Sequence, residues 1–181
     1  MSNEENGAPA PSVGENLNID FNFIKAFIDT TRLTLKVQCF TEIVPQKPYI
    51  KGKGQVPAAI DIAGVIGLTS KHFSGSIALC FPEKTFLSLV GKMLGEEYKE
   101  INDEVEDAAG ELLNIIFGQA KISLNKKGYE IEKALPSIFR GQDLKVKHLA
   151  PAPTVMLPFA VGDMTFHIEV GIDPNPSKPA A

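Results

Sequence analysis

The sequence contains no tryptophan, only three tyrosines and only two cysteines among 181 residues. With so few large aromatic rings, the chain offers little for a surface that stacks nucleotide bases. Its 18 Lys and Arg residues are outnumbered by 22 Asp and Glu residues, giving a net charge of −4, so we expect no nucleic-acid partner. Cys39 and Cys80 lie far apart in apolar contexts, which indicates a reducing compartment rather than a disulfide scaffold.

Long apolar runs and targeting signals are also missing. No stretch approaches the ~18 apolar residues of a membrane span. The first residues lack the basic start and apolar core of a signal peptide. We therefore expect a cytoplasmic protein with no membrane partner. The hydrophobic fraction of 44% and the charged fraction of 22% are those of ordinary globular proteins, and the length suits one domain.

Both ends of the sequence have the composition of tails. Residues 1–17 are rich in Asn, Glu, Gly, Pro and Ser, and residues 173–181 contain three prolines without an apolar anchor. Such segments cannot bury enough apolar surface to offset the entropy of ordering. We expect a disordered N-terminal tail over 1–17, one folded domain over 18–172 and a flexible C-terminal tail over 173–181.

Hydrophobic periodicity predicts three helices. The first follows Asp20, which is a plausible N-cap, and the second begins at Pro82. The third is longer and runs from Asp103 to about Asn125, with Asp103 and Glu106 in the spacing of a capping box. Each of these helices has an apolar face that must be buried against another layer.

The remaining apolar segments predict strands that are grouped rather than alternating with helices. The expected strands, apart from short pieces within 37–57, are 59–68, 73–81, 129–135, 144–149, 154–161 and 164–170. This order predicts an α+β fold, with a mostly antiparallel sheet of about six strands and helices layered on it.

Signatures of common metal and catalytic sites are absent from the sequence. The three histidines and two cysteines show none of the paired spacings of a zinc site. No GxSxG nucleophile motif and no P-loop ending occur either. His167 lies in an alternating segment, where a side chain on a strand face is the simpler interpretation. No metal site is therefore expected.

The third helix carries a narrow polar stripe. At about 100° per residue, a stripe about 80° wide contains Asp107, Glu111, Asn114, Gly118 and Lys121. Like charges at i,i+4 cost about 0.2–0.5 kcal/mol, and a glycine in mid-helix costs about 1 kcal/mol. A structural origin stays open, because the helix dipole stabilises acids near its start and Gly118 could admit another backbone. The alternative is a shallow polar ridge that inserts into a partner protein.

The same segment resembles the signature helix of a known family. The pattern consists of Asp107, three residues, Glu111, two residues and Asn114, with Pro136 a little over twenty residues on. It resembles the signature of the CheC/CheX/FliY family of chemotaxis phosphatases. The proline comes slightly earlier than in the usual pattern. Residues 75–83 and 93–96 resemble the strand and helix that precede the signature. The first helix contains no second Glu-x-x-Asn site, so the chain is most similar to CheX.

This resemblance implies a fold, a reaction and a partner. It implies a CheX/CheC-like domain that forms a homodimer and hydrolyses the aspartyl phosphate of a CheY-type response regulator. The regulator would supply Mg²⁺, so the chain would need no cofactor of its own. Asn114 would orient the attacking water and Glu111 would pair with the regulator's active-site lysine. The partner-binding residues would be Asp107, Gly118 and Lys121. The alternative is a non-catalytic binding module that docks on a receiver domain or a flagellar-switch component.

Overall fold

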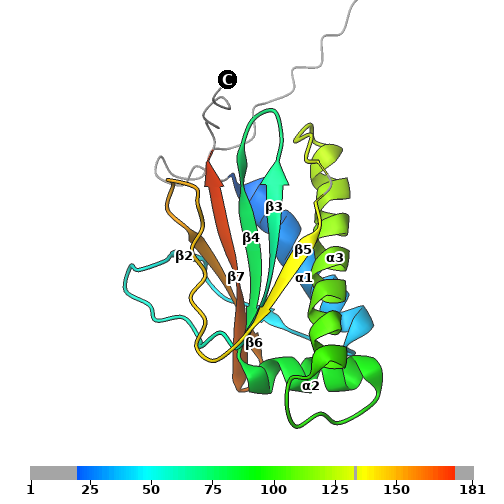
Figure 1. The fold of residues 1–181 in the computed structure, drawn as a ribbon. Helices are drawn as coiled ribbons and strands as arrows, with labels where there is room; N and C mark the ends of the chain where they lie inside the picture. Colours follow the sequence, from blue (N-terminus) through cyan, green and yellow to red (C-terminus); the bar gives the residue numbers. More distant parts are fainter. Residues whose placement is uncertain (1–19, 133, 174–181) are drawn as a thin grey trace, which may run out of the picture.

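The described part of the chain folds into three helices and a seven-stranded sheet (Figure 1). The computed structural model describes residues 20–132 and 134–173; the expected tail 1–17 and most of the expected tail 173–181 lie outside this range. The helices are α1 (Phe21–Gln38), α2 (Glu83–Leu94) and α3 (Asp103–Asn125). The strands are β1 (Val44–Pro45), β2 (Tyr49–Ile50), β3 (Ile62–Thr69), β4 (Ser74–Phe81), β5 (Pro136–Arg140), β6 (Val155–Val161) and β7 (Met164–Asp173). Within these described residues, no helix combines the length and apolarity needed to span a bilayer.

The sheet is antiparallel at every pairing between its strands. The strand order is β1-β6-β7-β4-β3-β5, and β2 also pairs with β6. The predicted hairpin between 59–68 and 73–81 corresponds to β3 and β4, and β6 turns directly into β7 at Gly162, whose φ is 61°. The α+β class and the mostly antiparallel sheet predicted from the grouped strands are confirmed.

Helices cover one face of the sheet, and the main core lies between the two layers. Figure 1 shows α1 and α3 against this face and α2 across its lower end. Alternate strand residues point toward the helices, as the two-residue period of a strand requires. Phe166 is one of them; it is 1% exposed and its ring stacks against Phe81 and Phe159, with centroids 4.8 and 4.9 Å apart.

Two contacts on the sheet side fix how α3 is held. Gly64 of β3 admits the helix closely, since a Cβ at this position would lie 2.9 Å from Leu113 Cδ2. Arg140 of β5 pairs with Asp103 at 3.0 Å and with Glu106 at 3.1 Å, at the start of the helix. The sheet therefore sets which side of α3 faces outward.

Capping side chains define the starts of α1 and α3. Asp20 caps α1 as predicted, because its Oδ1 accepts a hydrogen bond from Phe23 N at 2.9 Å. The predicted range of the third helix is confirmed, but its cap is wrong by one residue. Asn102 is the N-cap, since its Oδ1 accepts from Val105 N at 3.0 Å, and Asp103 is the first helical residue.

The strand predicted at 129–135 is wrong, and β5 begins only at Pro136. The Asn125 side chain prevents an extended chain here, because it accepts from Ile131 N at 2.7 Å and donates to Ile131 O at 3.1 Å. Glu130 has a φ of 52°, in the left-handed region, which also breaks a strand. Side-chain bonding to the local backbone takes the place of a strand ladder here, and Glu132 N donates a single backbone hydrogen bond to Thr69 O of β3 at 2.9 Å.

The strand predicted at 144–149 is also wrong, although its alternation of residue types is real. This segment crosses the sheet face opposite the helices, which we call the open face, without joining the ladder (Figure 1). Leu144 and Val146 pack on buried Ala63 and Cys80 of that face. Apolar and polar residues alternate here because one side of the segment is buried against the sheet. A strand and a segment that covers a sheet therefore show the same sequence pattern. At the C-terminal end, β7 runs to Asp173, one residue beyond the expected end of the folded domain at 172.

Candidate functional site

The side of α3 that faces away from the sheet carries all five residues of the predicted stripe. Asp107, Glu111 and Asn114 are exposed, and Gly118 and Lys121 are partly exposed. The buried residues of the helix occupy the opposite side. The structure thus places these five residues along one outward surface, which we call the α3 ridge.

The polar side chains of the α3 ridge are not engaged within the fold. Across residues 20–132 and 134–173, the side chains of Asp107, Glu111, Asn114 and Lys121 form no hydrogen bond or ion pair. The other asparagine of the helix, Asn125, is by contrast bonded to the backbone of the following turn. The donors and acceptors of the ridge are therefore available to a partner molecule.

Gly118 has no packing role among the described residues. A Cβ at this position would meet nothing within 4 Å, so the idea that it admits another backbone of the fold is not supported. The glycine thus lowers helix stability by about 1 kcal/mol relative to alanine without relieving a contact. Ile122, one turn further along, is 60% exposed and gives the ridge an apolar flank. The helix surface is recessed at Gly118, which has no side chain, and apolar beside it at Ile122. Such a surface suits contact with another protein.

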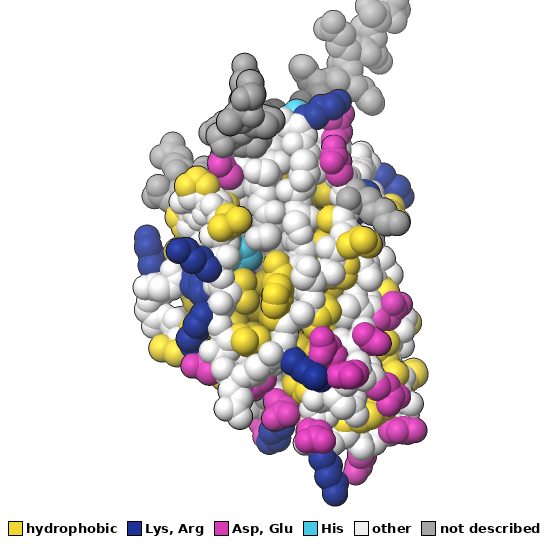
Figure 2. Space-filling model, viewed as in Figure 1, with side chains coloured by type: hydrophobic (Ala, Val, Ile, Leu, Met, Phe, Trp, Pro, Cys, Tyr) yellow, Lys and Arg dark blue, Asp and Glu magenta, His cyan; other side chains and the backbone are white. Residues whose placement is uncertain are grey.

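The surface around the start of α3 is acidic. Figure 2 shows acidic side chains gathered at the lower right, over the loop between α2 and α3 and the first turns of α3. The exposed carboxylates of this region are Glu96, Glu97, Glu100, Asp103, Glu104, Asp107 and Glu111. A field of one sign attracts a surface of the opposite sign, so this end of the ridge favours a cationic group on a partner.

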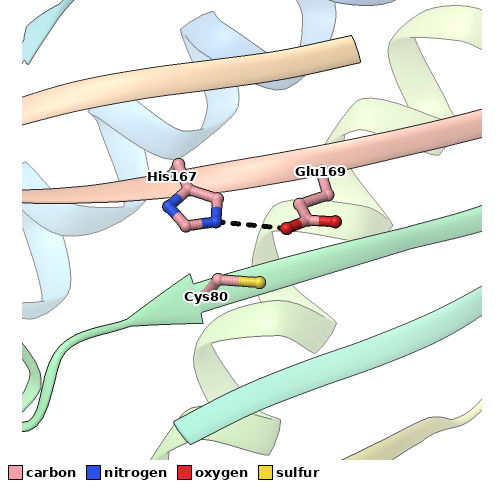
Figure 3. A group of neighbouring side chains, drawn as sticks. All are labelled: Cys80, His167 and Glu169. Atoms are coloured by element: carbon pink, nitrogen blue, oxygen red, sulfur yellow. Dashed lines mark hydrogen bonds and ion pairs between the residues drawn. The ribbon is translucent and has the colours of Figure 1, made fainter. Parts of the chain in front are cut away.

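A second polar cluster, on the open face, was not predicted from the sequence (Figure 3). Glu169 is completely buried, with Oε2 2.7 Å from Lys51 Nζ and Oε1 3.4 Å from His167 Nε2. Burial by itself raises the pKa of Glu169, but the nearby histidines and Lys51 outweigh it and hold that pKa well below its ordinary range. These residues come from distant segments of the chain. One sign of the cluster was present in the sequence: His167 and Glu169 are two residues apart in an alternating segment, so they share one face of a strand.

Comparison with known proteins places this architecture in a family. Residues 62–160, more than half of the chain, match the family model described as chemotaxis phosphatase CheX. The CheY-P phosphatase CheX of Thermotoga maritima is 27% identical over 156 residues, which cover 84% of this chain and 97% of that protein. Both matches include the α3 ridge and the β3–β4 hairpin before it.

Solved structures agree with the sequence matches. A CheC-like superfamily protein from Shewanella sp. PV-4 has a TM-score of 0.79 at 33% identity, covering 86% of this chain and 99% of that one. The CheX-CheY-BeF3-Mg+2 complex from Borrelia burgdorferi contains a chain of the same fold, with a TM-score of 0.70 at 24% identity, covering 83% of this chain and 97% of that one. The resemblance noted in the sequence is confirmed: the chain belongs to the chemotaxis phosphatase CheX family.

Proposed function

We propose that this chain hydrolyses the aspartyl phosphate of a CheY-type response regulator. The observation that carries the proposal is the pair Glu111 and Asn114, which lie three residues apart on the α3 ridge, exposed and without a partner in the described fold. The name of the Thermotoga maritima relative, a CheY-P phosphatase, supports the substrate class. The Borrelia burgdorferi complex supports CheY as the type of partner.

Asn114 acts in this proposal by positioning water. The water oxygen bonds to phosphorus in line with the aspartyl oxygen, the phosphorus–oxygen bond to aspartate breaks, and carboxylate and inorganic phosphate are released. A carboxamide both donates and accepts hydrogen bonds, so it can orient that water without being a strong base. Positioning of this kind supplies a large part of the acceleration in phosphoryl transfer. The Mg²⁺ belongs to the regulator, and the α3 ridge contributes no metal ligand.

Glu111 acts in this proposal by docking. Residues at i and i+3 share one side of a helix, so a lysine paired with Glu111 lies beside the group that Asn114 addresses. Asp107 extends the acidic contact by one turn toward the helix start. Lys121 lies near the other end of the ridge and contacts the partner there, and Gly118 leaves room for its surface.

The decay of a phosphorylated CheY-type receiver tests the proposed function. The receiver is phosphorylated, freed of phosphodonor and followed with Mg²⁺ present, with and without a substoichiometric amount of this chain. We expect faster phosphate release, with several receivers turned over per chain. Binding of the phosphorylated receiver without acceleration would contradict catalysis and favour the non-catalytic module instead.

Glu111→Ala should weaken docking more than turnover. A hydrogen bond to a charged group contributes about 1.5–3 kcal/mol, so we expect the KM for phosphorylated receiver to rise about 10- to 100-fold. A saturating receiver concentration should then restore most of the rate. Glu132→Ala removes the same charge from an exposed position beyond α3 and serves as the control. An unchanged KM, or a rate that saturation does not restore, contradicts the docking role.

Substitutions at Gly118 should separate stability from recognition. Gly118→Ala should raise the free energy of unfolding by about 1 kcal/mol, because the helix gains propensity and the Cβ meets open space. Gly118→Leu should leave the fold intact but raise the KM, since its side chain would stand between the ridge and the receiver. Ser123→Leu, exposed elsewhere on α3, is the matched control. Denaturant unfolding and the decay assay measure the two effects, and a KM unaffected by Gly118→Leu would show that the receiver does not cover this part of the ridge.

A further inference from the structure

Three side chains of metal-binding type meet on the open face of the sheet (Figure 3). They are Cys80 of β4 and His167 and Glu169 of β7, all buried, and one ligand atom from each lies within 4.8 Å of the others. Cys80 and His167 are direct partners in the β4–β7 register, and Glu169 is two residues further along the same face. The sheet therefore holds a thiol, an imidazole and a carboxylate side by side.

The spacing between His167 and Glu169 suits a shared metal better than a direct hydrogen bond. Nε2 of His167 lies 3.4 Å from Oε1 of Glu169. Hydrogen bonds of this type are usually about 2.7–3.2 Å long. Two ligand atoms at about 2.0–2.2 Å from a tetrahedral zinc ion are about 3.3–3.6 Å apart. The observed separation of 3.4 Å falls within that range.

A second histidine contacts the other oxygen of this carboxylate from the covering segment. The His148 side chain is 1% exposed; its Nδ1 lies 2.7 Å from Ser76 Oγ, and its Nε2 lies 3.3 Å from Glu169 Oε2. Gly171 makes room for the ring, since a Cβ there would lie 2.5 Å from His148 Cγ. His148 therefore supports the carboxylate from the Oε2 side, as the outer partners of a metal-ligating carboxylate do.

We propose that Cys80, His167 and Glu169 bind one Zn²⁺ ion, with a water molecule as the fourth ligand. A thiolate, an imidazole and a carboxylate are all ligands that zinc takes, and three protein ligands leave the fourth tetrahedral position to water. Mg²⁺ and Ca²⁺ prefer ligand sets made of oxygen alone. His148 of the covering segment 141–154 would hold Glu169 in place beside the ion. The site lies on the opposite side of the sheet from α3, so the proposal does not depend on the proposed function.

Lys51 is the cation that neutralises Glu169 in the absence of zinc. Its Nζ lies 2.7 Å from Glu169 Oε2 and donates to Val146 O at 2.8 Å, and its side chain is 32% exposed. Burial, reinforced by the charge of Glu169, raises the pKa of the Cys80 thiol well above its ordinary value. Zinc binding therefore replaces the thiol proton, which leaves to solvent, and competes with the Lys51 ammonium for the carboxylate.

Titration of the metal-stripped full chain with Co²⁺ and then Zn²⁺ tests the site. We expect one Co²⁺ per chain, with a sulfur-to-cobalt charge-transfer band and the intense visible bands of tetrahedral cobalt, all removed by one equivalent of Zn²⁺. Cys80→Ser should lose the charge-transfer band. Cys39→Ser should keep it, because that cysteine is buried on the helix side of the sheet. Thermal unfolding followed by circular dichroism confirms that each variant folds.

Two further variants examine the covering side chains. His148→Gln, outside the strands, should lower Zn²⁺ affinity at least about tenfold, and Lys51→Met should raise it by removing the competing charge. An affinity unchanged in either variant contradicts the site as proposed. No cobalt band in the wild-type protein, or a band that survives Cys80→Ser, overturns it. These readouts need no receiver, so a failed phosphatase assay leaves them unaffected.

Discussion

Asn114→Ala should remove most of the acceleration that this chain gives to receiver dephosphorylation, while the receiver still binds. We expect the turnover rate to fall about 100-fold or more, because loss of the positioned water costs at least that much. The KM should change by less than the rate does, since Glu111 and the surrounding acids still dock the receiver. Single-turnover decay at saturating chain, together with a separate binding measurement, resolves the two quantities.

The matched control for Asn114→Ala is on the same helix. Gln119→Ala also removes an exposed carboxamide, at a position about 140° around the helix from Asn114. Neither substitution should alter the free energy of unfolding by more than about 0.5 kcal/mol, because both side chains are at the surface. Equal losses of turnover in both variants, or full turnover in Asn114→Ala, would contradict the role assigned to Asn114.

Phe166→Ala should produce the largest loss of stability among single substitutions considered for this fold. The ring is 1% exposed and stacks against Phe81 and Phe159, so its removal leaves a cavity in the middle of the core. Deletions of this kind cost about 3–5 kcal/mol, a large fraction of the ~5–15 kcal/mol that holds a domain folded. Urea unfolding should show a lower midpoint with a similar slope.

The comparison for Phe166→Ala is a phenylalanine of the same sheet with a different environment. Phe139 of β5 is 52% exposed, so Phe139→Ala should cost far less. Similar losses in the two variants would mean that the aromatic stack is not the centre of the core. A smaller loss for Phe166→Ala than for Phe139→Ala would mean that the sheet relaxes around the missing ring.

Local signals in the sequence predicted the helices and hairpins well. Asp20 caps α1 through a backbone contact three residues away, and the range of α3 follows from periodicity alone. The stripe on α3 was also predictable, because helix geometry converts spacing directly into a common face. The roles of its residues, the homodimer, the lack of a cofactor and the cytoplasmic location stay predictions.

Interactions between distant segments could not be predicted in this way. The segment 144–149 alternates like a strand, yet it lies flat on the open face, and only the three-dimensional arrangement distinguishes the two. The buried cluster around Glu169 likewise joins Lys51, Cys80, His148 and His167 across more than a hundred residues of sequence. Spacing rules detect ligands that share an element, and these residues come from several.

One side of α3 is anchored to the sheet and the other side faces outward. Substitutions on the anchored side affect the packing of the core, and those on the outward side affect recognition of a partner. Gly64, Leu113 and Arg140 hold the helix from the sheet side, and none of them belongs to the ridge. Substitutions along the ridge can therefore retune which receiver is recognised without repacking the core. A chain of this architecture can acquire a new signalling partner through a few exposed positions, and paralogues that share the sheet can diverge in the pathway they serve.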